Sequence, residues 1–203
     1  MQTLLAVVAV LVNGVVGGAS VANLSDAELA AALRGEIPVH TETFTSSKGK
    51  SAGRGVAAIV VNRPLSECWA TVTHYEDKAE YTPRLKSVAV LDKQPDLVHV
   101  RMEVDASVTT ARYTAWFRLD EAQHHIKWTL DHQAKDNTIA DVEGEYRLYE
   151  LAGDRTLMVY QTWVDSGHAV PRFIQDYMAR KSLPNMLKAV KQRIESGGSW
   201  RKS

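Results

Sequence analysis

Hydrophobic and polar residues alternate over most of residues 84–165, and a period of two is typical of strands with one buried face. The clearest run is "LVHVRMEVDASV" (97–108), where one face holds Val98, Val100, Met102, Val104, Ala106 and Val108. The runs "ARYTAWFRL" (111–119), "HIKWTLD" (125–131) and "DVEGEYRLYE" (141–150) alternate in the same way, whereas "TLMVYQTWV" (156–164) is apolar on both faces. Such closely spaced strands predict an antiparallel meander with one covered face and one solvated face.

A long helix is predicted near the C-terminus, over "VPRFIQDYMARKSLPNMLKAVKQRI" (170–194). Its first apolar stripe consists of Val170, Phe173, Ile174, Tyr177 and Met178, and its second of Leu183, Leu187, Val190 and Ile194. At about 100° per residue, the second stripe is rotated by roughly 140° from the first, so a straight helix cannot bury both on one surface. A break near 180–184, with Ser182 as N-cap and Pro184 in the new first turn, resolves this conflict. We expect the helix to cross the concave face of a curved sheet and to bend with it.

Shorter elements precede the meander. "NLSDAELAAALRGEI" (23–37) predicts a helix with Ser25 as N-cap and Glu28 completing a capping box. "TSSKGKSAGRG" (45–55) predicts the turn of a hairpin or long bend, and "LSECWATVTHYEDKAEY" (65–81) predicts one or two short helices, with Ser66 assisting as a cap.

The N-terminal residues 1–22 differ from the rest of the chain. No charge occurs from Leu4 to Ala22, and the small residues Ser20-Val21-Ala22 end the segment. We therefore expect an export signal cleaved after Ala22 and a periplasmic or secreted protein, although no Lys or Arg precedes the apolar run as in a standard signal. An uncleaved membrane anchor is the alternative.

Composition narrows the function classes. Lys plus Arg and Asp plus Glu both number 24, so the formal net charge is zero and no basic patch indicates nucleic acid. Cys68 is the only cysteine, so the chain forms no internal disulfide, and a buried inert thiol is the expected state of Cys68. The length of 203 residues fits one domain with an appendage.

Candidate catalytic and metal-binding patterns are weak. His124 and His125 are adjacent, so on a strand they point to opposite faces, and no His-Glu-x-x-His or Cys-x-x-Cys spacing occurs. Asp141, Glu143 and Glu145 alternate with apolar residues, as on a solvated strand face. We expect no metal and no cofactor.

Several segments carry a family resemblance when taken in order. They are "VVNRPLSECWATV" (60–72), "YTPRLKSVAVL" (81–91), "EGEYRLYEL" (143–151), "HAVPRFI" (168–174) and "SLPNMLKAVKQRIE" (182–195). Together they resemble the START-like superfamily, also called SRPBCC, which includes lipid-transfer domains and polyketide cyclase/dehydrase proteins. Tyr146 stands where that superfamily often has the Trp of a Gly-x-Trp motif, which bears on the shape of the pocket.

The resemblance implies an α+β helix-grip fold, in which a curved antiparallel β-sheet wraps around a long C-terminal α-helix with an apolar cavity between them. The expected organisation is a signal peptide (1–22), an N-terminal helix and extension (23–53), a START-like domain (54–195) and a flexible tail (196–203). The inward-facing residues expected to line the cavity are Trp69, Met102, Val104, Tyr113, Phe117, Trp128, Tyr146, Phe173 and Tyr177.

Such a cavity suits a hydrophobic ligand, because each buried methylene contributes about 0.8 kcal/mol and a sixteen-carbon chain gains on the order of 12 kcal/mol. We expect a monomeric, non-catalytic binder and transporter of a lipid or other hydrophobic small molecule, with transient membrane contact and no nucleic acid. Two alternatives stay open: an enzyme of the cyclase/dehydrase type, and a membrane-tethered partner protein with no open cavity.

Overall fold

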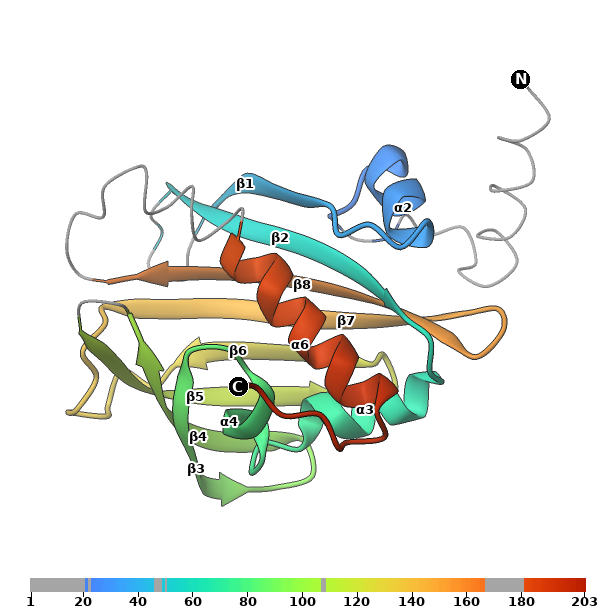
Figure 1. Cartoon of the computed structure of the whole chain (residues 1–203). Coiled ribbons are helices and arrows are strands. Elements are labelled where there is room, and N and C mark those ends of the chain that lie inside the picture. The colour runs from blue at the N-terminus through green and yellow to red at the C-terminus, as the bar shows by residue number, and fades with distance from the viewer. Residues whose placement is uncertain (1–20, 22, 46–48, 50, 107–108, 167–180) are drawn as a thin grey trace.

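The computed structural model describes residues 21, 23–45, 49, 51–106, 109–166 and 181–203. Eight antiparallel strands form one sheet in the order β1-β2-β8-β7-β6-β5-β4-β3. The last helix, α6, crosses one face of this curved sheet diagonally (Figure 1). The predicted α+β helix-grip architecture, with a meander closed by a C-terminal helix, is confirmed.

The elements follow the predicted order. The strands are β1 (Val39–Thr45), β2 (Ser51–Val61), β3 (Leu85–Lys93), β4 (Leu97–Asp105), β5 (Thr110–Asp120), β6 (His125–Leu130), β7 (Asp141–Leu151) and β8 (Arg155–Asp165). The helices are α2 (Asp26–Leu33), α3 (Leu65–Thr73), α4 (Lys78–Tyr81) and α6 (Leu183–Glu195).

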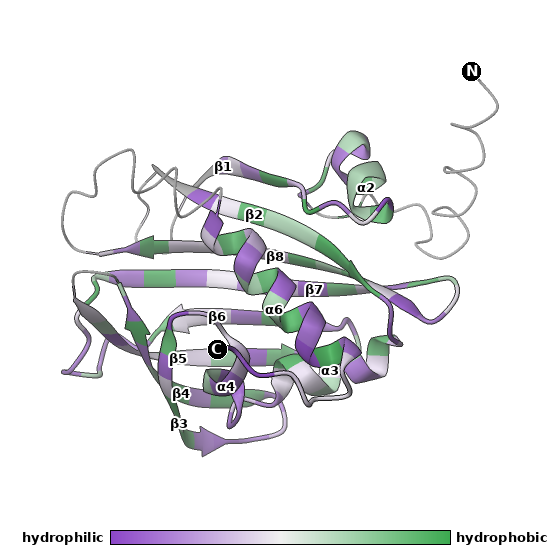
Figure 2. Cartoon of the chain, viewed as in Figure 1, coloured by the Kyte–Doolittle hydropathy of each residue, from purple (hydrophilic) through white to green (hydrophobic). Residues whose placement is uncertain are grey.

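The inner face of the sheet, which faces α6, holds the main core. Val98, Val100 and Met102 of β4 are buried there, as the alternation of that strand predicts. Leu187, Val190 and Ile194 of α6 belong to the same core, so the second predicted stripe of the long helix is confirmed. Apolar and polar residues alternate along α6 accordingly (Figure 2).

The outer face, expected to be solvated, is covered over β2 and β8. Leu157 and Val159 of β8 pack there with Val56 of β2, and Leu29 and Leu33 of α2 pack against them. The neighbouring β8 residues Met158 and Tyr160 instead belong to the core on the inner face. Because both faces of β8 are buried, its sequence is apolar on both faces and could not be oriented.

Of three predictions about the ends of helices and strands, one is confirmed, one is wrong and one holds over a shorter range. The capping box of α2 is present, because the Ser25 hydroxyl accepts from the Glu28 N–H and the Glu28 carboxylate accepts from Ser25. The expected Ser66 cap is wrong, because Pro64 is the N-cap of α3 and no side chain caps that end. The expected loop over 45–55 is shorter, because Ser51 already pairs with Thr45 as β2 begins.

The start of α6 partly follows its prediction. Pro184 occupies the first turn as expected, but Ser182 has helical backbone angles and its side chain caps no N–H group. Lys181 and Ser182 form a π-helical turn immediately before α6. The first predicted stripe, with Phe173 and Tyr177, lies outside the described residues.

Residues 196–203, expected to form a flexible tail, are held against α4 and β3. The Arg193 guanidinium donates to the Trp200 carbonyl at 2.9 Å, and the Lys202 N–H donates to the Glu80 carbonyl at 3.0 Å. The Lys202 ammonium also donates to the Thr82 carbonyl at 3.0 Å. The acceptors of the two Lys202 bonds are carbonyl groups at the end of α4, which the tail reaches because α6 packs beside α4.

One edge of the sheet is irregular. β3 pairs with β4 in a register that shifts twice, between Leu85 and Ser87 and again between Val90 and Asp92. Such bulges bend and twist a strand locally. β3 is therefore a strongly irregular edge strand.

Candidate functional site

A chain of aromatic rings lies on the inner face beneath α6. The ring of Tyr75 is 4.8 Å from that of Phe117, and Phe117 lies 5.7 Å from Trp128. Trp128 stacks at 5.4 Å on Tyr160, whose ring is 4.7 Å from Tyr146. We call these five residues the inner aromatic cluster. They join the segment after α3 to four neighbouring strands.

A glycine makes room for the central ring of this cluster. Gly144 of β7 pairs directly with Trp128 of β6. A Cβ atom at Gly144 would lie 2.1 Å from Trp128 Cζ2 and 2.6 Å from the Gln161 carbonyl oxygen. The indole ring therefore lies over the β7 backbone, which only a residue without a side chain permits.

Tyrosine hydroxyls gather on the same face. The Tyr146 hydroxyl contacts Met186 Sδ at 3.2 Å, and the Tyr113 hydroxyl contacts Met102 Sδ at 3.5 Å. Burial raises the pKa of Tyr160 to about 12 and raises the pKa of Tyr146 well above its usual value. These hydroxyls stay protonated and act as hydrogen-bond donors in an apolar setting.

The Tyr75 hydroxyl differs from the others. Tyr75 is 1% exposed, and in the described part of the chain its buried hydroxyl has no hydrogen-bond partner. Burial, with a smaller effect of nearby Tyr81, raises the pKa of Tyr75. A buried hydroxyl without a partner costs about 1–3 kcal/mol, so this group is poised to bond a molecule that enters the site.

Lys78 brings a positive charge to this region. It is half-buried on α4, and its Nζ lies 4.8 Å from the centre of the Tyr75 ring. Burial lowers the pKa of Lys78 to about 8, although nearby Asp77 raises it in part. The Asp77 carboxylate itself accepts from Arg193 and lies 3.0 Å from the His74 ring nitrogen, so its hydrogen bonds are made to these two residues.

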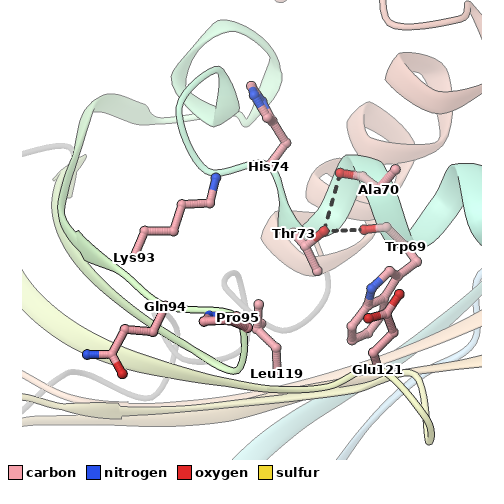
Figure 3. Close-up of a pocket in the computed structure, with 9 residues that line it drawn as sticks. All are labelled: Trp69, Ala70, Thr73, His74, Lys93, Gln94, Pro95, Leu119 and Glu121. Atoms are coloured by element: carbon pink, nitrogen blue, oxygen red, sulfur yellow. Dashed lines mark hydrogen bonds between the residues drawn. The ribbon is translucent and has the colours of Figure 1, made fainter.

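A surface groove opens beside α3 (Figure 3). It has a volume of about 480 Å³ and is lined by Trp69, Ala70, Thr73, His74, Lys93, Gln94, Pro95, Leu119 and Glu121. Trp69 makes an edge-to-face contact with His124 at 5.4 Å between ring centres. The Thr73 hydroxyl donates to the Trp69 carbonyl at 2.8 Å, so it is satisfied within its own helix. The groove thus has apolar walls and a polar rim.

The groove and the inner aromatic cluster are neighbours in the chain. Leu119 of the groove stands two residues after Phe117 on the same face of β5, and both belong to or pack against the inner core. His74 of the groove directly precedes Tyr75. Two residues that line the groove therefore stand within two positions of members of the inner aromatic cluster.

The expected solvated strand face of β7 is partly wrong. Asp141 is 1% exposed and Glu145 is 8% exposed. The Glu145 carboxylate lies 2.8 Å from His125 Nε2 and accepts from Arg147 Nε at 3.0 Å. Burial opposes ionisation of Glu145, but these bonds outweigh it, so its pKa lies below the usual value. The cluster lies on the outer face, away from the inner aromatic cluster.

The structure distributes the predicted lining residues over two places. Met102, Phe117, Trp128 and Tyr146 are buried in the inner core, and Val104 and Tyr113 pack half-buried against it. Trp69 also contacts the core but lines the groove. Phe173 and Tyr177 lie outside the described residues, and contact of any of these residues with a ligand stays a prediction.

Tyr75, Lys78 and Tyr160 were not predicted from the sequence. Tyr75 lies in the irregular segment between α3 and α4 and Lys78 is the first residue of the four-residue α4, so no periodicity marks an inward face there. Tyr160 lies on the strand that is apolar on both faces. The Tyr75-x-x-Lys78 spacing was the one available signal, because it puts a phenol and an ammonium within reach of each other.

Other candidate chemistry finds little support within the described residues. They contain no group of three or more His, Cys, Asp or Glu residues placed to hold a metal ion. Cys68 is fully buried, and burial raises the pKa of its thiol. None of the helices in this part of the chain has the length and apolar character needed to cross a membrane.

The curved antiparallel sheet, the crossing C-terminal helix and the aromatic inner face define a helix-grip protein. The sequence model of the family described as "polyketide cyclase / dehydrase and lipid transport" matches residues 61–191. The chain belongs to this family, and the predicted START-like resemblance is confirmed. A comparison with curated protein sequences gives no match.

Solved structures with a similar fold include both kinds of protein in that description. The Zhui aromatase/cyclase from Streptomyces sp. R1128 has a TM-score of 0.60 and 19% identity over 70% of this chain and 93% of its own. The STAR-related lipid transfer protein from Xanthomonas axonopodis has a TM-score of 0.64 and 13% identity over 78% of this chain and 93% of its own. Human StAR-related lipid transfer protein 5 has a TM-score of 0.61 and 11% identity over 84% of this chain and 93% of its own. At these identities the likeness shows a shared fold.

Proposed function

We propose that this protein binds and transports a lipid or other hydrophobic small molecule on its inner face, without catalysis. The observation that carries the proposal is the composition of that face. In the described strands, the buried positions on that face carry aromatic, aliphatic and hydroxyl side chains, whereas the buried carboxylates Asp141 and Glu145 lie on the opposite face of β7. Such a surface binds apolar molecules and orients them with few polar contacts. It offers no acid–base pair for a reaction.

The groove supports this function as an entry route. Its apolar wall includes Trp69 and Leu119, and it lies next to the inner aromatic cluster through Phe117 and Tyr75. A hydrophobic molecule entering there leaves water gradually, first against the groove and then against the inner face. The proposed setting is an exported protein that contacts membranes transiently as a monomer.

The first test is native mass spectrometry of the protein purified from its own cells, followed by extraction and identification of bound lipid. We expect one hydrophobic molecule per chain. If the protein is empty and also takes up nothing from a total lipid extract of those cells, the carrier function is wrong.

A matched pair of variants links uptake to the inner face. Val104→Arg places a charge where Val104 packs half-buried against the inner core, and we expect uptake to fall at least about 10-fold. Leu91→Arg is the control, because Leu91 is 45% exposed on β3. Equal uptake by two folded variants would show that this face does not hold the ligand.

The second candidate is a cyclase/dehydrase-type enzyme, which the similarity to the Zhui aromatase/cyclase favours. In that case the buried tyrosine hydroxyls position a polyketide-like substrate. Conversion of a poly-β-ketone thioester by the wild-type protein, with loss of conversion in Tyr146→Phe, would establish the enzyme in place of the carrier.

A further inference from the structure

Lys78 and Tyr75 are two polar groups that the apolar function proposed above does not use. Tyr75 belongs to the inner aromatic cluster, where its ring packs 4.8 Å from Phe117, and Lys78 lies beside the cluster, with its Nζ 4.8 Å from the centre of the Tyr75 ring. The Tyr75 hydroxyl is buried without a partner, and among the described residues the Lys78 ammonium contacts the face of that ring and forms no ion pair with a carboxylate.

Three other lysines near the groove and α6 donate to oxygen atoms. Lys93 pairs with Glu76 at 2.8 Å, Lys191 donates to the Val60 carbonyl at 2.8 Å, and Lys202 donates to the Thr82 carbonyl at 3.0 Å. Lys78 has a carboxylate next to it in Asp77, but Asp77 bonds Arg193 and His74 instead. Among these four lysines, Lys78 is therefore the one whose ammonium has no oxygen acceptor within the described residues.

We propose that Lys78 and Tyr75 form a head-group subsite for the carboxylate of a long-chain acid, whose alkyl chain lies along the inner aromatic cluster. This assignment rests on the hydrophobic-ligand function proposed above and names its ligand class. One ammonium and one hydroxyl can each donate to one oxygen atom of a carboxylate, and both bonds are charge-assisted because the acceptor is ionised. A doubly charged phosphate would leave part of its charge without a partner.

The surroundings favour an anion at this point. Burial lowers the pKa of Lys78 to about 8, so the free protein holds its ammonium in a poorly solvated place. A bound carboxylate would supply a directly hydrogen-bonded counter-charge, whereas Asp77 acts on Lys78 only through its proximity. The same anion accepts from the Tyr75 hydroxyl and removes its unsatisfied state. Binding of a carboxylate therefore stabilises both Lys78 and Tyr75. A neutral alcohol can accept a hydrogen bond but supplies no counter-charge, so it stabilises them less.

The test compares hexadecanoate with hexadecanol by equilibrium dialysis against the full chain at pH 7. We expect the wild-type protein to bind hexadecanoate about 10-fold or more tightly than hexadecanol. Lys78→Met should remove this preference while the affinity for hexadecanol stays within about 3-fold of the wild-type value. Lys127→Met is the matched control, because Lys127 is exposed on β6 and should leave the preference intact.

The outcomes separate this subsite from the general function. Binding of neither probe by the wild-type protein overturns hydrophobic-ligand binding itself. Equal binding of both probes, or a preference that persists in Lys78→Met, overturns the subsite and leaves the carrier function standing. Lys78→Arg keeps the charge, so restored preference in that variant supports the assignment, and it replaces Lys78→Met as the informative comparison if the latter does not fold.

Discussion

Gly144→Ala tests the packing on which the inner aromatic cluster depends. The added Cβ would lie 2.1 Å from Trp128 Cζ2, where ordinary contacts begin at 3.4 Å. The indole cannot move that far in its present rotamer, and an off-rotamer side chain costs about 0.5–1.5 kcal/mol. Movement also weakens its contacts with Phe117 and Tyr160, each contributing about 0.5–1.5 kcal/mol beyond area burial.

A second contact prevents a simple escape. The same Cβ lies 2.6 Å from the Gln161 carbonyl oxygen of β8, which is backbone and is fixed by the pairing of Gly144 with Thr162. Alanine is favoured over glycine within a strand by about 0.5–1 kcal/mol, which offsets part of the cost. We expect a net loss of about 2–4 kcal/mol in the free energy of unfolding, or roughly 5–15 °C in Tm.

The assay is urea unfolding followed by circular dichroism, with the m-value checked for a two-state transition. Gly55→Ala is the control, because its Cβ would meet only the end of the Leu183 side chain, at 2.5 Å from Cδ1. A leucine methyl group rotates away, so we expect a loss of about 1 kcal/mol or less. Equal effects of the two substitutions would refute the steric reasoning.

Two further predictions concern Glu145 and Cys68. Glu145→Gln should lower the free energy of unfolding by about 1–3 kcal/mol at pH 7, because His125 and Arg147 lose a buried charged acceptor. Since the folded-state pKa of Glu145 is lowered from 4.5, its contribution to stability is present above pH 4.5 and is lost as the pH falls through the folded-state pKa. Urea titrations of wild type and variant at several pH values measure this contribution. A stability difference that does not shrink in acid would contradict the prediction. Cys68→Ser should leave hexadecanol binding unchanged and cost about 1–3 kcal/mol of stability, because a hydroxyl replaces a fully buried thiol. A folded variant that no longer binds would show that Cys68 has a functional role.

Much of the fold was predictable because local periodicity coincides with burial. Val98, Val100 and Met102 alternate with polar residues, and each is buried in the core on the inner face as expected. The capping box at Ser25 was predictable for a similar reason, because it depends on two residues three positions apart. Signals of this kind need no knowledge of distant contacts.

The failures concern residues whose environment is set by distant segments. Glu145 alternates like a solvated residue, but Asn23, Gln161 and His125 approach it through the hydrogen-bond network of the outer face. The tail over 196–203 was expected to be flexible, and its bonds to Glu80 and Thr82 join it to residues more than a hundred positions earlier. Sequence patterns carry no signal for such pairings.

The candidate site was predictable only in outline. The alternation of β5 and β6 placed Phe117 and Trp128 on the inner face, which the structure bears out as a position. It gave no warning of Tyr75 and Lys78, because their approach depends on how α4 docks beside β3 and α6. The apolar residues of the inner face could be predicted from strand periodicity. The polar residues Tyr75 and Lys78 could not, because they lie outside the periodic strands.

The two register shifts in β3 affect how these molecules meet one another. A regular edge strand exposes a straight ladder of N–H and C=O groups onto which a second chain can add, and this is a common route to aggregation. In β3 the ladder is interrupted twice within Leu85–Lys93, and Lys86 and Lys93 add exposed positive charge along it. A strand arriving from another copy finds no uninterrupted stretch long enough to pair. The two irregularities therefore disfavour addition of a further strand at this edge of the sheet.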